Sequence, residues 1–235
     1  IESACGLHVL FHPPVFTSVC SVPQVRISEI FHSLQGEART VGCPTVFVRL
    51  TGCPLRCQYC DTAYAFSGGD LLELDDILAR VARYKARYVT VTGGEPLAQP
   101  NCLPLLVGLC DAGYEVSLET SGALDIAQVD SRVSVVLDLK TPDSGECHRN
   151  LYSNIPLLKQ IDQVKFVICS RTDYQWAKLK LDELDLASRV QDVLFSPSYK
   201  QVSPTDLAEW ILEDRLPVRF QIQLHKQLWA DEPGR

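Results

Sequence analysis

The chain has 235 residues, of which 46% are hydrophobic and 22% charged, which allows one large domain or two small ones with a substantial core. Its formal net charge of −7 argues against duplex DNA or RNA as a partner, although a local basic pocket for one small anion stays compatible with it. No uninterrupted apolar run reaches about 18 residues, so the sequence predicts no membrane span.

The first 24 residues differ from the remainder of the chain. They contain no Lys or Arg and therefore lack the positive segment that opens a signal peptide. Two adjacent prolines also interrupt any helical or strand period. We therefore expect residues 1–24 to form an N-terminal extension that is poorly ordered or foreign to the fold, and residues 25–235 to form the domain.

From residue 25 onward, short β-branched and apolar runs alternate with helical patterns. Strands are predicted over 26–31, 45–51, 88–92, 114–119, 133–139, 163–168, 193–195 and 218–224. Helices are predicted over 71–85, 101–112, 173–186 and 204–213. This alternation is typical of βαβ units and a parallel sheet. About six such units follow residue 60, fewer than the eight of a closed barrel, so the predicted fold class is α/β, a partial (open) βα barrel of about six parallel strands.

Polar residues follow several predicted strands. They lie at 92–96, 119–122, 138–140, 196–198 and 225–226. Parallel α/β folds bind ligands at the carboxyl ends of their strands. The sequence therefore predicts that these segments line one shared cavity.

The stretch CPLRCQYC places Cys53, Cys57 and Cys60 within eight positions. Three thiols could belong to a zinc site completed by Cys43 or a distant histidine, although structural zinc usually shows two paired hooks. A redox pair at Cys57 and Cys60 would leave Cys53 unexplained. A [4Fe–4S] cluster held by three thiolates would keep one iron open for a substrate or cofactor. The spacing favours this third interpretation.

The remaining cysteines are scattered singly along the chain, some of them in apolar segments. Free cysteine in such segments behaves as a small buried hydrophobe. Ten cysteines in 235 residues also fall below the density of secreted disulfide scaffolds. We therefore interpret the scattered cysteines as structural thiols and expect a reducing compartment, the cytoplasm.

Two motifs together carry a family resemblance. The cysteine spacing, with Tyr59 before the last cysteine, resembles the signature of the radical S-adenosylmethionine (SAM) superfamily, and TGGEP at 92–96 resembles its glycine-rich SAM motif. Within that superfamily, the segments EIFHSLQGE, CDT, LETSG and the ending LHKQLW resemble the 7-carboxy-7-deazaguanine synthase family, over residues 25–235. That family acts in queuosine and deazapurine biosynthesis.

The resemblance implies a set of site residues by position. The cluster ligands would be Cys53, Cys57 and Cys60, and the Mg²⁺ ligand would be Thr62. The SAM contacts would be Tyr59, Cys60, Asp61, Gly94, Glu95, Asp138, Leu139, Lys140, Ser196, Pro197, Ser198 and Tyr199. The substrate contacts would be Leu34, Gln35, Gly36, Glu37, Arg49 and Thr92.

The implied reaction contracts the ring of 6-carboxy-5,6,7,8-tetrahydropterin and releases ammonia, with a 5′-deoxyadenosyl radical rather than a side chain as the reactive group. Glu37 and Gln35 suit the pterin's amino-pyrimidinone edge, and Arg49 suits its carboxylate, unless Arg49 forms only a salt bridge at the rim. The resemblance further implies a flavodoxin- or ferredoxin-type reductant and a homodimer, with no nucleic acid and no membrane. Two alternatives stay open: a glycyl-radical-activating enzyme, and a non-catalytic iron–sulfur or zinc protein.

Overall fold

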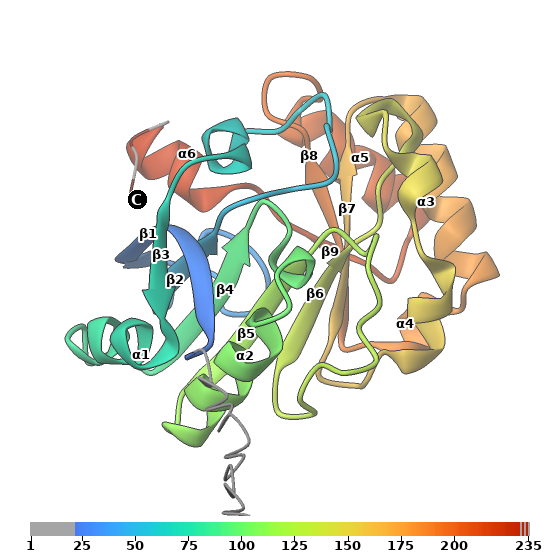
Figure 1. Ribbon diagram of the computed structural model, residues 1–235. Helices are drawn as coiled ribbons and strands as arrows, with labels where there is room; N and C mark the ends of the chain where they lie inside the picture. Colours follow the sequence, from blue (N-terminus) through green and yellow to red (C-terminus); the bar gives the residue numbers. More distant parts are fainter. Residues whose placement is uncertain (1–21, 231, 233, 235) are drawn as a thin grey trace, which may run out of the picture.

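The computed structural model describes residues 22–230, 232 and 234. Its framework is one sheet with the strand order β3-β1-β2-β4-β5-β6-β7-β8-β9 (Figure 1). The strands are β1 (Gln24–Leu34), β2 (Pro44–Leu50), β3 (Asp70–Glu73), β4 (Tyr88–Gly93), β5 (Glu115–Thr120), β6 (Ser134–Asp138), β7 (Gln163–Ile168), β8 (Asp192–Pro197) and β9 (Arg219–Phe220). The α-helices are α1 (Leu74–Ala82), α2 (Cys102–Asp111), α3 (Arg171–Glu183), α4 (Leu186–Arg189), α5 (Pro204–Asp214) and α6 (Leu224–Trp229).

The predicted open α/β sheet is confirmed. The neighbouring strands β2, β4, β5, β6, β7, β8 and β9 pair in parallel. Strand β1 pairs antiparallel with β2 on one side and with β3 on the other. Because β3 and β9 lie at opposite ends of the strand order, the sheet does not close into a barrel. The two-residue strand β9 brings the parallel set to seven strands, where the sequence predicts about six.

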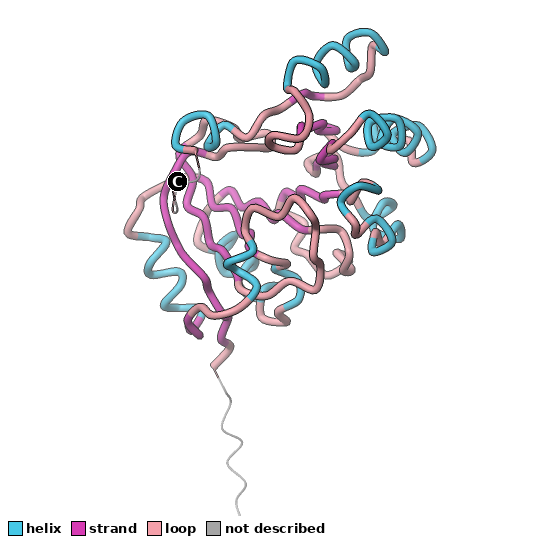
Figure 2. The backbone as a smooth tube through the Cα atoms, turned by 90° about the horizontal axis from the view of Figure 1, so that it is seen from above, coloured by secondary structure: helices cyan, strands magenta, loops and turns pink. Residues whose placement is uncertain are grey.

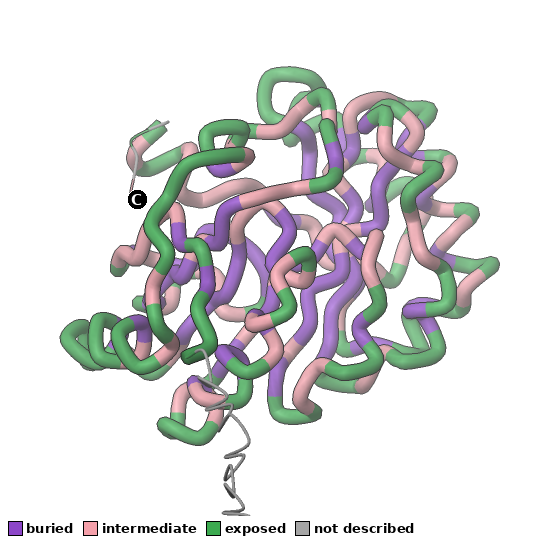
Figure 3. The backbone as a smooth tube through the Cα atoms, viewed as in Figure 1, coloured by how far each residue is buried: buried purple, intermediate pink, exposed green. Residues whose placement is uncertain are grey.

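The two faces of the sheet differ in chemistry because successive strand side chains alternate between them. One face carries the apolar residues that pack against α1, α2, α3 and α5 in two hydrophobic clusters. The other face carries polar side chains such as Thr92, Glu119 and Lys165, which line a cavity. Figure 2 shows the curved sheet with helices along its outside, and Figure 3 shows burial concentrated in the strands. The polar face of the sheet therefore forms a wall of the cavity, and the hydrophobic core packs against the opposite face.

Tyr174 illustrates how the helices are fixed to the sheet. Its ring is fully buried and lies edge-on to Phe195 of β8, with ring centroids 6.0 Å apart. Its hydroxyl donates to the Asp214 carboxylate and the Trp210 carbonyl of α5, each at 2.7 Å. A buried phenol needs such partners, because an unpaired hydroxyl in the core costs free energy. One side chain thus ties α3 to both β8 and α5.

Two predicted elements differ from the structure in their bounds. Residues 71–73 form part of β3 rather than the start of a helix, because Leu71 and Leu72 pair with β1 and this tertiary pairing overrides their helical spacing. The predicted strand over 218–224 shortens to β9, and His225 with Lys226 lies on α6 rather than at a strand end. The chain enters α6 here because Leu224 donates its backbone N–H to the Gly36 carbonyl instead of to a strand.

Other expectations concern the ends of the chain and the membrane. The proposed extension over 1–24 falls almost entirely outside the described residues, and β1 begins at Gln24, one residue before the predicted domain start. Across residues 22–230, no helix combines the length and apolar character needed to cross a membrane.

Candidate active site

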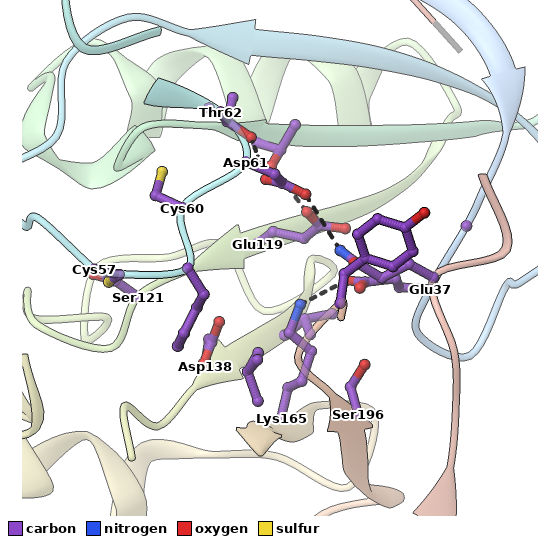
Figure 4. A pocket seen from close by; sticks show the side chains of 18 of the residues that line it. Glu37, Cys57, Cys60, Asp61, Thr62, Glu119, Ser121, Asp138, Lys165 and Ser196 are labelled. Atoms are coloured by element: carbon purple, nitrogen blue, oxygen red, sulfur yellow. Dashed lines mark hydrogen bonds and ion pairs between the residues drawn. The ribbon is translucent and has the colours of Figure 1, made fainter. Parts of the chain in front are cut away.

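The predicted polar segments line one cavity of about 420 Å³ at the carboxyl ends of the parallel strands. Figure 4 looks into this cavity: Cys57 and Cys60 lie on one side, Glu37 and Ser196 lie on the other, and Asp138 and Glu119 lie between them. Nineteen of the twenty-one site residues predicted from the sequence line it, the exceptions being Glu95 and Leu139. The sequence prediction of one shared cavity is therefore confirmed.

The three clustered cysteines lie on the loop that follows β2. Its turn is closed by the Cys60 N–H, which donates to the Cys57 carbonyl at 3.1 Å. Arg56 braces the loop from outside, since its guanidinium donates to the Cys53 carbonyl at 2.8 Å and its backbone N–H donates to Glu146 at 2.6 Å. The loop thus presents its thiols from a backbone that is fixed at several points.

The chemistry of the thiols fits soft metal ligands. Burial raises the pKa of the Cys57 thiol to about 11 and also raises the pKa of Cys53, while the Lys140 ammonium acts in the opposite direction on both. A soft metal centre would displace these protons, because the thiolate is the ligand form. Among the described residues, no three His, Cys, Asp or Glu side chains converge on one metal ion. In an iron–sulfur cube, each thiolate would bind a different iron.

The Gly93–Gly94 turn packs β4 against the cysteine loop. A Cβ on Gly93 would lie 2.2 Å from the Leu50 carbonyl oxygen, and one on Gly94 would lie 2.2 Å from that of Gly52. Glycine is required at both positions because any larger residue would push these backbones apart. Glu95, predicted as a SAM contact, points away from the cavity and is fully buried.

The buried Glu95 carboxylate acts as a brace. It accepts hydrogen bonds from the Thr120 hydroxyl at 2.9 Å and from the Ser121 backbone N–H at 2.7 Å. These bonds fix the end of β5 next to the end of β4. The side-chain oxygens of Glu95 are thus bonded at the end of β5, and the contact between Glu95 and SAM stays a prediction.

The segment after β6 divides between core and cavity. Leu139 is fully buried in the hydrophobic core and does not line the cavity, so a SAM contact by this residue stays a prediction that its side-chain position does not support. Lys140 and Asp138 face the cavity and form an ion pair of 2.8 Å. The Asp138 Oδ1 atom and the Tyr59 hydroxyl are buried without a hydrogen-bond partner among the described residues. Such atoms suit a polar ligand, because a buried unpaired polar atom is costly.

The far end of the cavity carries a polar network from the loop that follows β1 and from β4, β5 and β7. The Lys165 ammonium pairs with Glu37 at 2.6 Å, and the Thr92 hydroxyl donates to Glu119 at 2.9 Å. Gln35 donates to Thr90 at 3.0 Å. Burial raises the pKa of Glu119, whose carboxylate accepts the Thr92 bond. This end therefore offers both donors and acceptors to a flat heterocycle.

Lys165 and Glu119 are site residues that the sequence prediction missed. Lys165 is the single charged residue in the apolar strand over 163–168, and such an interruption could have identified it. Glu119 begins one of the predicted polar segments, yet its role could not be separated from that of a backbone cap. The Glu37–Lys165 pair joins residues 128 positions apart, so only the fold brings them together.

Arg49 lies at the cavity with one edge of its guanidinium occupied. Its Nε donates to Glu29 at 2.7 Å, and Glu29 also accepts from the Tyr64 hydroxyl at 2.8 Å. The guanidinium carbon lies 5.8 Å from the ring centroid of Phe31. The salt bridge that the sequence left as an alternative is therefore present, and it also fixes the direction of the guanidinium.

Thr62 also lines the cavity and lies two residues before Tyr64, whose ring centroid is 5.9 Å from the Arg49 guanidinium carbon. Its hydroxyl donates to Asp61 at 2.8 Å and makes no side-chain cap on the short 3-10 helix η1 (Ala63–Phe66) that follows. Asp61 in turn accepts from Gln223 at 3.3 Å and pairs with Lys226 at 3.7 Å. Burial opposes ionisation of Asp61, but the Thr62 bond and Lys226 outweigh it and lower its pKa. A charged oxygen thus lies next to the Thr62 hydroxyl.

Helix α6 is seated directly on the segment predicted to contact substrate. The Leu224 N–H donates to the Gly36 carbonyl at 3.0 Å, and a Cβ on Gly36 would lie 2.3 Å from His225 Nδ1. Burial lowers the pKa of His225. Gly36 therefore allows α6 to close one wall of the cavity.

Comparison with known proteins agrees with this geometry. The sequence model of the Radical SAM superfamily matches residues 47–151. A 7-carboxy-7-deazaguanine synthase from Chlorobaculum tepidum is 44% identical, covering 87% of this chain and 94% of the relative, and one from Koribacter versatilis is 40% identical, covering 88% and 98%. The crystal structure of QueE from Escherichia coli matches with a TM-score of 0.70 at 25% identity, covering 86% of this chain and 95% of that one. The chain therefore belongs to the 7-carboxy-7-deazaguanine synthase family of the radical SAM superfamily.

Proposed function

We propose that this chain catalyses the ring contraction of 6-carboxy-5,6,7,8-tetrahydropterin to 7-carboxy-7-deazaguanine, with release of ammonia. The observation that carries the proposal is a continuous cavity with three thiols at one end and amide, carboxylate and ammonium groups at the other. A radical formed at the thiol end would meet a substrate at the other end without leaving the protein. Enclosure matters because a primary radical must not meet water or a wrong C–H bond.

The thiol end fits a [4Fe–4S] cluster and SAM. Cys53, Cys57 and Cys60 would each hold one iron, and the unpartnered Tyr59 hydroxyl and Asp138 Oδ1 would bind polar groups of the cofactor. When bound, the cluster and SAM supply a 5′-deoxyadenosyl radical that removes a hydrogen atom from the substrate. The further residues proposed to contact SAM are Cys60, Asp61, Gly94, Lys140, Ser196, Pro197, Ser198 and Tyr199, all of which line the cavity.

The opposite end would bind the pterin. The Gln35 amide and the Glu37 carboxylate match the donors and acceptors of its amino-pyrimidinone edge, and Lys165 holds Glu37 in place through an ion pair of 2.6 Å. Arg49 would bind the substrate carboxylate with the guanidinium nitrogens that Glu29 does not engage. Leu34, Gly36 and Thr92 complete this wall of the cavity.

Mg²⁺ is proposed to bind at the Thr62 hydroxyl. Hard cations prefer oxygen ligands, and Mg²⁺ keeps several waters when it binds to proteins. The neighbouring Asp61 carboxylate, whose pKa is lowered through its bond to Thr62 and by Lys226, adds negative charge near that position. The substrate carboxylate and water would supply the remaining ligands.

Three further features belong to the same proposal. A flavodoxin- or ferredoxin-type protein would supply single electrons, and the enzyme would act as a homodimer, both on the strength of the family resemblance. A cytoplasmic location rests on cysteine usage, because every cysteine among the described residues is a free thiol.

A glycyl-radical-activating enzyme would need a site that admits a segment of protein backbone. The described cavity is instead lined by convergent polar side chains at a volume typical of small-molecule sites. A non-catalytic metal protein would have no use for the buried unpartnered atoms beside the thiols. The small-molecule reaction is therefore the function that the geometry supports best.

The proposal is tested by anaerobic reconstitution of the protein with iron and sulfide. It is then incubated with SAM, dithionite, Mg²⁺ and the carboxypterin, and the products are identified by mass spectrometry. We expect 7-carboxy-7-deazaguanine only when SAM is present, no SAM cleavage in Cys57→Ala, and full cleavage in the control Cys102→Ala, whose thiol is buried in the core. A fully loaded protein that leaves the pterin unchanged would reject the substrate assignment.

A further inference from the structure

Asp138 and Lys140 form an ion pair in a place where charge is costly. Their side chains are only 16% and 9% exposed, and the ammonium lies 2.8 Å from Asp138 Oδ2. Taking two charges out of water usually costs more than their attraction returns, so such a pair is weak support for the fold itself. We therefore expect the ion pair in the cavity to serve the function of the site rather than the stability of the fold.

The backbone holds Lys140 in a fixed position. The Lys140 N–H donates to Asn150 Oδ1 at 2.9 Å, and the Asn150 amide donates back to the Lys140 carbonyl at 2.9 Å. This reciprocal clamp lies just beyond the end of β6. The ion-pair partner of Lys140, Asp138, is the last residue of β6. Both charges of the pair are therefore held at fixed positions relative to the opposite wall of the cavity.

The wall that faces the pair carries the cysteines. The Lys140 ammonium lies 5.5 Å from the ring centroid of Tyr59, which stands between Cys57 and Cys60 in the sequence. All of these residues line the same cavity, and Figure 4 shows Asp138 pointing toward the region between Cys57 and Lys165. Charges in such a poorly solvated site interact more strongly than charges at the surface.

We propose that the Asp138–Lys140 pair sets the reduction potential of the iron–sulfur cluster, as two fixed charges of opposite sign rather than as ligands. This inference rests on the function proposed above. Reduction passes one electron from a low-potential one-electron donor to the cluster and forms or breaks no bond, so it adds one negative charge. The ammonium favours that charge and the carboxylate disfavours it. The potential then reflects the balance between the two.

The test is an anaerobic redox titration of the reconstituted protein, followed by electron paramagnetic resonance without SAM or substrate. We expect Lys140→Met to lower the equilibrium constant for cluster reduction at least tenfold, which is 59 mV for a one-electron couple. Asp138→Asn should shift it in the opposite direction, and the double variant should fall between the two. Lys140→Arg, which keeps the charge, should stay close to wild type.

A matched control removes the same charge elsewhere. Lys178 pairs with Asp214 at 2.9 Å between α3 and α5, outside the cavity, so Lys178→Met should leave the potential unchanged. Iron and sulfide content is measured for each variant. If Lys140→Met fails to assemble the cluster, the Asp138→Asn variant alone tests the inference. A cluster potential in Asp138→Asn that does not rise above the wild-type value overturns it.

A second outcome would also overturn it. A fully loaded Lys140→Met protein with unchanged potential but weakened SAM binding would make Lys140 a simple cofactor contact. Because the titration contains neither SAM nor pterin, its result is independent of the reaction assigned above. Failure of the pterin assay would thus leave the measured potentials interpretable.

Discussion

Gly36→Ala should undock helix α6 from the cavity. The added Cβ would lie 2.3 Å from His225 Nδ1 and 3.3 Å from the His225 backbone nitrogen, so the ring must retreat by about 1 Å before ordinary contact is restored. The ring cannot retreat without moving α6, because Leu224 is bonded to the Gly36 carbonyl at 3.0 Å. Gly36 has a backbone conformation that alanine adopts freely, so the clash is the only penalty.

The cost should be about 1–2 kcal/mol, the lower part of the range for overpacking. It stays small because α6 has no buried residue and can move as a unit while the sheet remains intact. Such a cost corresponds to roughly a 5- to 30-fold rise in the open population of α6. Global thermal unfolding should therefore change little.

Two measurements follow this change. Hydrogen exchange at the amides of α6 should accelerate by that factor, and the KM for the pterin should rise while cluster content and SAM binding stay near wild type. Gly108→Ala is the matched control, because the added Cβ on α2 would lie 3.4 Å from Leu78 of α1, an ordinary contact. In the Gly36→Ala background, His225→Ala should slow the exchange again by removing the clashing ring. Wild-type exchange in Gly36→Ala would refute this account of the contact.

Three more predictions concern the same cavity. Arg49→Ala should weaken pterin binding by about 1.5–3 kcal/mol and leave SAM binding almost unchanged in calorimetry, because a charge-assisted bond is lost at the pterin end only; equal losses would make Arg49 structural. Thr62→Val should abolish most of the Mg²⁺ stimulation of turnover, while Thr62→Ser keeps part of it; since Thr62 makes no side-chain cap, thermal stability should hold in both. Burial lowers the pKa of His225, so the unfolded state binds more protons, and the docking of α6 should weaken as pH falls below about 6.5. The protection factors of the α6 amides, which correct for slower intrinsic exchange at lower pH, should fall there in wild type, and a His225→Gln variant with the same pH dependence would assign the effect to another group.

Much of the fold followed from local patterns. Strand and helix runs alternate along the chain, and Ser203, followed by Pro204, caps the start of α5 in the structure. The three-cysteine spacing and the glycine turn at 93–94 are also short-range features, because a cluster loop and a tight turn are each built from neighbouring residues. Such features can be recognised before any long-range contact is known.

Boundaries that depend on tertiary partners were not predictable in the same way. Leu71 and Leu72 have helical spacing but form β3, because β1 offers an edge with which to pair. Residues 224–229 resemble the end of a strand but form α6, because Gly36 supplies the partner for the Leu224 N–H. In both cases a segment distant in sequence decided between two local conformations of similar energy.

The sequence by itself determined the residue types needed for radical chemistry and the order in which they occur. Tertiary structure decided which of them share a cavity. It placed Leu139 in the core and bonded the Glu95 carboxylate to Thr120 of β5. It also paired Glu37 with Lys165, 128 positions away in the sequence. The physical reason is the alternation of side chains along each strand. A shift of one residue exchanges the core face for the cavity face, and only the pairing of all the strands fixes that choice.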